Sequence, residues 1–155
     1  PREGRLMSLA TTETRIADVL ASVMGMGKVY DRIRTEIDRG LAEEHITFSG
    51  DVNVWEFSLD TETLHDDAGG LYRDEGIVSI VAHYKHDDEN NSRGVFRDLI
   101  QAVSNALMNV GSGFPQIKEP GVVLLERPTE PIKMRTGHSA YRARLEFRLW
   151  NLSNT

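Results

Sequence analysis

Two short stretches of the sequence combine histidine with carboxylate side chains, the combination that could bind a metal ion. The first is "HYKHDDEN" at residues 83–90, and the second is "HDD" at residues 65–67. Imidazole nitrogens and carboxylate oxygens are metal ligands in proteins. If the two stretches met in space, they could form the site of a small metal-dependent enzyme. The candidate ligands are His83, His86, Asp87 and Asp88, with His65, Asp66 and Asp67 in the second stretch.

A structural interpretation explains the first stretch without a metal. The apolar run of residues 76–84 predicts a strand, and helical periodicity resumes after the N-cap candidates Asn91 and Ser92. Side chains three residues apart on a strand point to opposite faces, so His83 and His86 would diverge if the strand continued. Acids before a helix N-terminus are favoured by about 0.3–1 kcal/mol each at low salt. We therefore predict a strand end, a charged turn and a helix start, and no metal site.

Nucleophilic and phosphate-binding chemistry also lack their usual residues. The chain has no cysteine, which excludes disulfides, thiol nucleophiles and zinc–thiolate sites. It has no "GxSxG". The glycine pairs at residues 25–27 and 111–113 lack the Lys and Ser/Thr of a phosphate-binding loop. We assign no catalytic residue and no cofactor, and we predict that the protein is not an enzyme.

A row of arginines near the C-terminus is the other chemically notable feature. Residues 139–150 alternate strictly, with Arg142, Arg144 and Arg148 on the polar side. The row could be a solvated strand face, a protein interface or a nucleic-acid contact. The formal net charge of −6 argues against the third interpretation. Trp150 ends the same row and favours the second.

Hydrophobic periodicity predicts the elements that hold these residues. Apolar residues at helical spacing predict helices within residues 11–27 and from residue 92 onward. Residues 28–45 are predicted to form a short strand or turn leading into a helix. The fold class is therefore α+β, with a mostly antiparallel sheet of four to five strands backed by two main helices. The strands are expected at residues 51–59, 76–84, 122–126 and 139–150.

Size and composition fit one globular unit. The 155 residues are 39% apolar and 27% charged, typical of a globular domain. We predict a flexible N-terminal arm at residues 1–11 and one α+β domain at residues 12–152. No apolar run approaches the ~20 residues that span a bilayer, and the N-terminus lacks a signal-peptide pattern. We therefore expect the chain to originate in the cytoplasm.

Three stretches are predicted to be long loops, at residues 60–76, 111–121 and 126–138. Loops of this length in a small domain are usually functional or disordered. Because no catalytic group is in sight, we expect them to contact neighbouring subunits.

The order of these segments resembles a known family. An amphipathic helix is followed by "GKVYDRIR", "VNVWEFSL", "GIVSIVAHY", "SRGVFRDLIQAVSNAL" and the final strand "SAYRARLEFRLW". Over about residues 12–150, this pattern is similar to the tail-terminator and head–tail joining (neck) proteins of tailed bacteriophages. The resemblance implies a small α+β subunit that forms a ring, typically a hexamer, at the top of the tail. Such a ring stops growth of the tail tube and presents a surface to the head connector.

The resemblance also implies partners and a location. The partners would be copies of itself, the tail-tube protein and head-connector proteins, with DNA passing through the lumen unbound. The protein would reside in the tail or neck of the virion, after assembly in the cytoplasm of the bacterial host. Ring subunits need two complementary patches, which the acidic segment at residues 60–76 and the arginine row could supply. The predicted contact residues are Asp66, Asp67, Tyr72, Arg73, Arg142, Arg144 and Arg148.

Three alternatives stay open from the sequence. One is another minor tail or head-completion protein of the same kind of particle. Another is a small metal-dependent enzyme that uses His83, His86 and Asp87. The third is a module that binds a small ligand or peptide on its sheet face.

Overall fold

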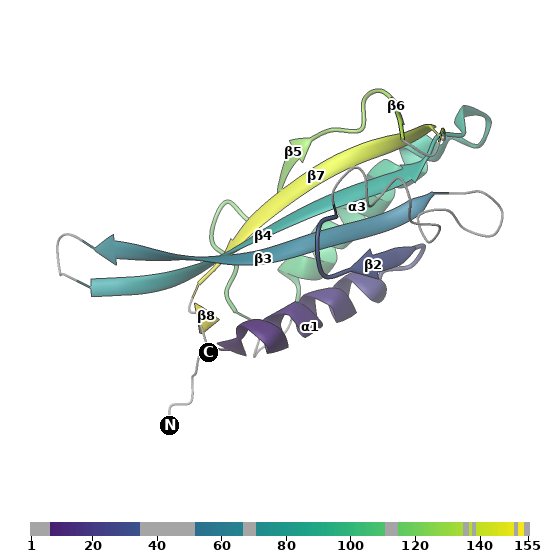
Figure 1. The fold of residues 1–155 in the computed structure, drawn as a ribbon. Helices are drawn as coiled ribbons and strands as arrows, with labels where there is room; N and C mark the ends of the chain where they lie inside the picture. The colour runs from purple at the N-terminus through teal and green to yellow at the C-terminus, as the bar shows by residue number, and fades with distance from the viewer. Residues whose placement is uncertain are drawn as a thin grey trace.

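Within the residues that the structure describes, two helices and a six-stranded mixed sheet form an α+β fold in the computed structural model (Figure 1). The structure describes residues 7–34, 52–66, 71–110, 115–134, 137, 139–150 and 152–153. The strands lie in the order β2-β3-β4-β7-β5, and β6 pairs with β7. β2 is parallel to β3, and the other pairs in this sheet are antiparallel. The elements are β1 (Met7–Ser8), α1 (Leu9–Ala21), β2 (Lys28–Tyr30), β3 (Asn53–Asp66), β4 (Leu71–Lys85), η2 (Asp88–Asn90), α3 (Ser92–Met108), β5 (Val123–Glu126), β6 (Ile132–Lys133), β7 (Ser139–Leu149) and β8 (Leu152–Ser153).

The main core lies between the two helices and one face of the sheet. Trp55 of β3 and Phe96 of α3 are fully buried there, with an edge-to-face ring contact at 5.9 Å. α1 contributes Ile16 and Leu20. The strand β4 is central in the sheet, as its nearly continuous apolar run predicted. The helical periodicity of α3 and the alternation of β7 are confirmed: their apolar positions form the core, namely Leu99, Ile100, Val103 and Leu107 with Tyr141, Ala143, Leu145, Phe147 and Leu149.

Replacing Ile80 with valine should lower the free energy of unfolding by about 0.5–1.5 kcal/mol. The side chain of Ile80 is fully buried in the core, so the lost methylene leaves a void. The matched control is Ile77→Val on the same strand, because Ile77 is half-buried on the opposite face; it should change stability by less than about 0.5 kcal/mol. Urea denaturation followed by tryptophan fluorescence measures both. Equal losses in the two variants would contradict this assignment of faces.

Both chain ends depart from the predicted boundaries. α1 begins at Leu9, two residues before the helix predicted within residues 11–27, and Thr12 is fully buried. Residues 7–11, assigned to an N-terminal arm, lie in β1 and the first turn of α1. β1 pairs with β8 in parallel, which places Met7 and Ser8 beside Leu152 and Ser153. The short strand predicted near residue 28 is β2; most of the helix predicted after it lies outside the described residues.

The long loop predicted at residues 60–76 is wrong. β3 and β4 pair continuously from Asn53↔Tyr84 to Asp66↔Leu71. β7 stops pairing with β4 at Gly76, so residues 62–66 and 71–75 pair with each other and with no third strand among the described residues. We call this two-stranded segment the arm. It extends about 15 Å beyond the sheet, and Figure 1 shows it projecting from one end of the molecule.

Candidate functional site

The histidines of "HYKHDDEN" do not converge. His83 is buried on the sheet face opposite the helices, which we call the outer face, with 1% of its surface exposed. Tyr84 points the other way and stacks on Phe96 in the core at 5.3 Å. β4 ends at Lys85, and His86 follows it in an exposed position. The two imidazoles therefore belong to different environments.

The acidic residues that follow form the joint between β4 and α3. The backbone N–H of Asp87 donates to Ser92 Oγ at 2.8 Å, and the Ser92 N–H donates back to the Asp87 carbonyl at 3.1 Å. Asp88 accepts a hydrogen bond from the Tyr141 hydroxyl at 2.8 Å and lies 3.1 Å from His86 Nε2. Asn91 occupies the predicted N-cap position, but with a φ of 51° and no capping hydrogen bond from its side chain. The predicted strand end, turn and helix start are confirmed.

The ionisation of this joint follows from the same contacts. The hydrogen bonds from Tyr141 and then from His86 lower the pKa of Asp88. Burial, and then the hydrogen bond to Asp88, raise the pKa of Tyr141. Both shifts favour a hydroxyl that donates to an ionised carboxylate. The hydrogen bond from Tyr141 to Asp88 thus links β7 to the turn before α3.

Within the described ranges, no three His, Asp or Glu side chains are arranged to hold a metal ion. His65 and Asp66 are the last two residues of β3. Asp67, which the metal hypothesis also used, lies outside the described residues.

Two of the predicted contact arginines are tied to the neighbouring strand. Arg142 Nε donates to Glu126 Oε2, and Arg144 Nε donates to Glu126 Oε1, each at 3.0 Å. Glu126 ends β5, so this fork joins the edge of the sheet to β7. Half of the Arg144 side chain is still exposed. The arginine row therefore has a structural role in addition to any contact it makes.

The third arginine anchors the root of the arm. Arg148 Nη1 lies 3.1 Å from Glu75 Oε1, and Lys118 Nζ lies 3.2 Å from Glu75 Oε2. The Glu75 side chain has no exposed surface, and Lys118 also lies over the Trp150 ring at 4.8 Å. Burial alone would raise the pKa of Glu75, but the hydrogen bonds and charges of Arg148 and Lys118 outweigh it and lower the pKa. Glu75 of the acidic segment and Arg148 of the arginine row, which were predicted to meet between subunits, therefore pair within one chain.

Replacing Glu75 with glutamine removes the negative charge that pairs with Arg148 and Lys118, so it should lower the free energy of unfolding at pH 7. The loss should be limited to about 1–2 kcal/mol, because water partly solvates the two cations. The folded-state pKa of Glu75 is below its ordinary value of 4.5. Its stabilisation is therefore fully present above pH 4.5 and is lost as the pH falls through the folded-state pKa. The gap between wild type and variant should narrow on acidification in urea titrations from pH 7 to pH 3. The matched control, Glu126→Gln, removes a carboxylate that also has two arginine partners but is one-third exposed; it should lose less than about 1 kcal/mol. A gap that stays constant with pH would contradict this role of Glu75.

A buried ion pair on the outer face was not predicted from the sequence. Arg34 Nε donates to Glu56 Oε2 at 2.9 Å, and the side chains are 7% and 0% exposed. The Arg34 guanidinium also lies 4.0 Å from the centre of the Tyr30 ring. Alternation along β3 placed Glu56 opposite the core but could not show that this part of the outer face is covered.

A basic groove is the second feature that sequence reasoning missed. It lies between the first turns of α3 and the segment after β5, with a volume of about 480 Å³. Ile100 and Leu124 supply its apolar part. Arg93 Nε donates to the Pro128 carbonyl at 3.1 Å across the groove. The remaining lining residues are Arg97, Asp98, Gln101, Arg127 and Thr129.

No protein-family model matches the chain. A search of curated proteins finds no similar sequence either. Among the described residues, no helix combines the length and apolar character needed to cross a membrane.

Proposed function

We propose that the protein is a structural subunit of a tailed phage or phage-derived particle, a tail-terminator or neck protein that forms a ring. The arm is the observation that carries this proposal. The sequence resemblance supplies the kind of particle, and the arm supplies a physical reason for assembly.

A two-stranded ribbon is marginally stable in water without a third strand or a packed face. The arm nevertheless continues the pairing of β3 and β4 past the last β7 partner, Leu149. Glu75, buried by Arg148 and Lys118, holds its root on the sheet. A ribbon that is anchored at one end and projects at the other is suited to contact a neighbouring subunit.

Assembly through the arm would be head to tail. The arm projects from one end of the sheet, so it can reach a surface of the neighbour other than the neighbour's own arm (Figure 1). Heterologous contacts of this kind generate rings when the rotation closes. The predicted contacts Asp66, Tyr72 and Arg73 lie on the strands of the arm.

The charge distribution suits a ring through which DNA moves. The whole chain has a net charge of −6. A lumen of this sign would not retain phosphate backbones. The arginine row, the exception noted in the sequence, is partly neutralised by Glu126 and Glu75.

The test combines solution mass with tail-tube binding. Light scattering over a range of protein concentrations, with negative-stain imaging, should reveal closed rings of about six subunits. Added to tail tubes of the same particle, the protein should bind at tube ends and stop further growth. Tubes that grow unchanged at saturating protein, with no density at their ends, would overturn the proposed function.

A further inference from the structure

We infer that the basic groove between α3 and β5 is the receptor for the arm of a second copy of this chain. This inference rests on the proposed function and names the surfaces through which its ring would close. Three features of the described structure carry it: arginines without an ion-pair partner, an apolar floor, and a position from which the arm of the same chain projects away.

The arginines of the groove differ from those of the arginine row in their partners. Arg142, Arg144 and Arg148 are each paired with a carboxylate. By contrast, no described residue forms an ion pair with Arg97 or Arg127, which are both exposed at the groove.

The other charges that line the groove leave this excess in place. Arg93 donates to the Pro128 carbonyl, and its charge also helps to lower the pKa of Asp88 in the neighbouring joint, so the excess rests on Arg97 and Arg127. Asp98 is the one acid among the described lining residues. The groove is therefore a cationic surface on an acidic protein, and an acidic segment is its natural ligand.

The groove also offers apolar area and an open strand edge. Ile100 and Leu124 line it, and the adjacent Leu125 of β5 is 60% exposed. Within the described residues, β5 pairs with β7 alone and forms the edge of the main strand order. An extended ribbon such as the arm can lie along such an edge while its charges meet the arginines.

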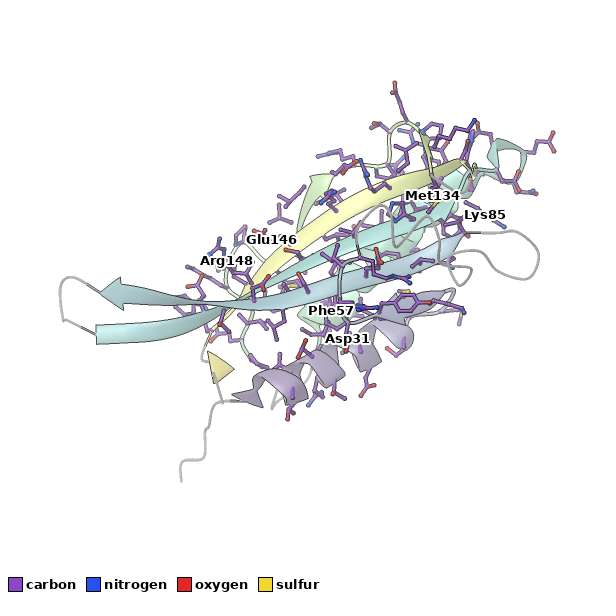
Figure 2. The ribbon with its side chains drawn as sticks, viewed as in Figure 1. Asp31, Phe57, Lys85, Met134, Glu146 and Arg148 are labelled. Carbon is purple, nitrogen blue, oxygen red and sulfur yellow. The ribbon has the colours of Figure 1, made fainter. Side chains whose placement is uncertain are left out.

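The placement of the two surfaces excludes a contact within one chain. The arm meets the sheet at Gly76, and the Leu124 end of the groove lies level with Ile80, because Leu145 of β7 pairs with both residues. Four extended residues, about 13 Å, separate these two levels, and the arm runs from Gly76 in the direction away from the groove. In Figure 2, Arg148 lies near the root of the arm and Lys85 lies at the opposite end of the sheet. Arm and groove therefore meet between copies, as a head-to-tail ring requires.

Nucleic acid is the other class of ligand that could occupy a cationic groove. The net charge of −6 opposes its approach. The acidic residues 60–76 supply instead a complementary ligand that is present on every copy at equal concentration.

Site-specific cross-linking tests the contact directly, because the chain has no native cysteine. One preparation carries Thr63→Cys in the arm, and the other carries Thr129→Cys in the groove. A short bis-maleimide reagent should link the mixture at least about tenfold more than a mixture in which Thr14→Cys, on exposed α1, replaces the groove variant. The yield should fall as salt rises, since the contact is electrostatic. Equal yields for groove and control positions would overturn the inference.

Charge reversal separates the groove from general electrostatics. Arg97→Glu with Arg127→Glu should abolish the arm–groove cross-link and the ring. Adding Glu62→Lys and Asp66→Lys on the arm should restore both. The matched control reverses Arg32 and Lys133, which are exposed elsewhere; it changes the net charge equally and should leave assembly intact. Rings that survive the groove reversal would overturn the inference and leave the proposed function standing.

Two further outcomes are distinguishable. An arm–groove cross-link without binding to tail-tube ends supports this contact and counts against the proposed function. A DNA oligonucleotide that binds wild type but not the groove variant, together with an absent cross-link, overturns the inference in favour of nucleic acid.

Discussion

Replacing Arg34 with alanine is expected to lower the free energy of unfolding by about 3–5 kcal/mol. The substitution leaves the Glu56 carboxylate without its 2.9 Å partner at a position that has no exposed surface. It also removes the guanidinium that lies over the Tyr30 ring. Urea denaturation at pH 7, followed by tryptophan fluorescence, measures the loss.

The double variant Arg34→Met with Glu56→Leu is the matched control. Two apolar side chains of similar volume often replace a buried ion pair at no loss of stability. The double variant should therefore recover most of the stability that the single variant loses. If Arg34→Ala alone loses less than about 1 kcal/mol, the pair behaves as a solvated surface pair and water reaches Glu56.

The buried pair illustrates what strand alternation can and cannot predict. Alternation along residues 53–59 correctly separates Trp55 and Phe57 from Glu56. Whether the second face of a sheet is covered depends on which distant segment lies over it. Arg34 is 22 residues away from its partner, and nothing in the local pattern of either residue marks the pairing.

The predictions that succeeded rest on amphipathic periodicity. α3 presents Phe96, Leu99 and Val103 on one side, and β7 alternates strictly, so each sequence is compatible with one orientation against a core. These two patterns, with the apolar run of β4, are sufficient for the α+β class. The joint at Asp87 was also predictable, because helix starts have local signals.

The loop predicted at residues 60–76 was wrong for the opposite reason. Residues 60–66 are polar at nearly every position, so they show no apolar face in either period. Their strand conformation comes from continued pairing with residues 71–77. Pairing is a long-range property, and a glycine-containing acidic stretch is read as a loop when pairing is ignored.

The groove was not predicted from the sequence, because its arginines are far apart in the chain. Arg93 and Arg97 lie on α3, and Arg127 follows β5. The arginine row attracted attention because its members are neighbours in one strand, yet these are the arginines that carboxylates compensate. Charge in a sequence identifies candidates, and the folded structure decides which of them remain available.

Shortening the arm should abolish assembly while the fold is retained. Replacing residues 63–74 by Asn-Gly keeps the Glu62↔Glu75 pair and closes it with a two-residue hairpin turn. Glu75 keeps its contacts with Arg148 and Lys118, so the sheet should lose little stability. The contact surface with the neighbouring copy is removed. Light scattering should then report a monomer at concentrations where the wild type forms rings.

The control is a variant with the arm at full length and its acids neutralised, namely Asp66→Asn with Asp67→Asn. Because the ribbon is retained and part of its charge is lost, this variant should assemble more weakly than wild type, by roughly tenfold in concentration, and with less dependence on salt. Circular dichroism and urea denaturation should show both variants folded. Rings formed by the shortened protein at the wild-type concentration would show that the arm is not the assembly element. The subunit contact would then have to be sought on the outer face, where Arg144 is half exposed.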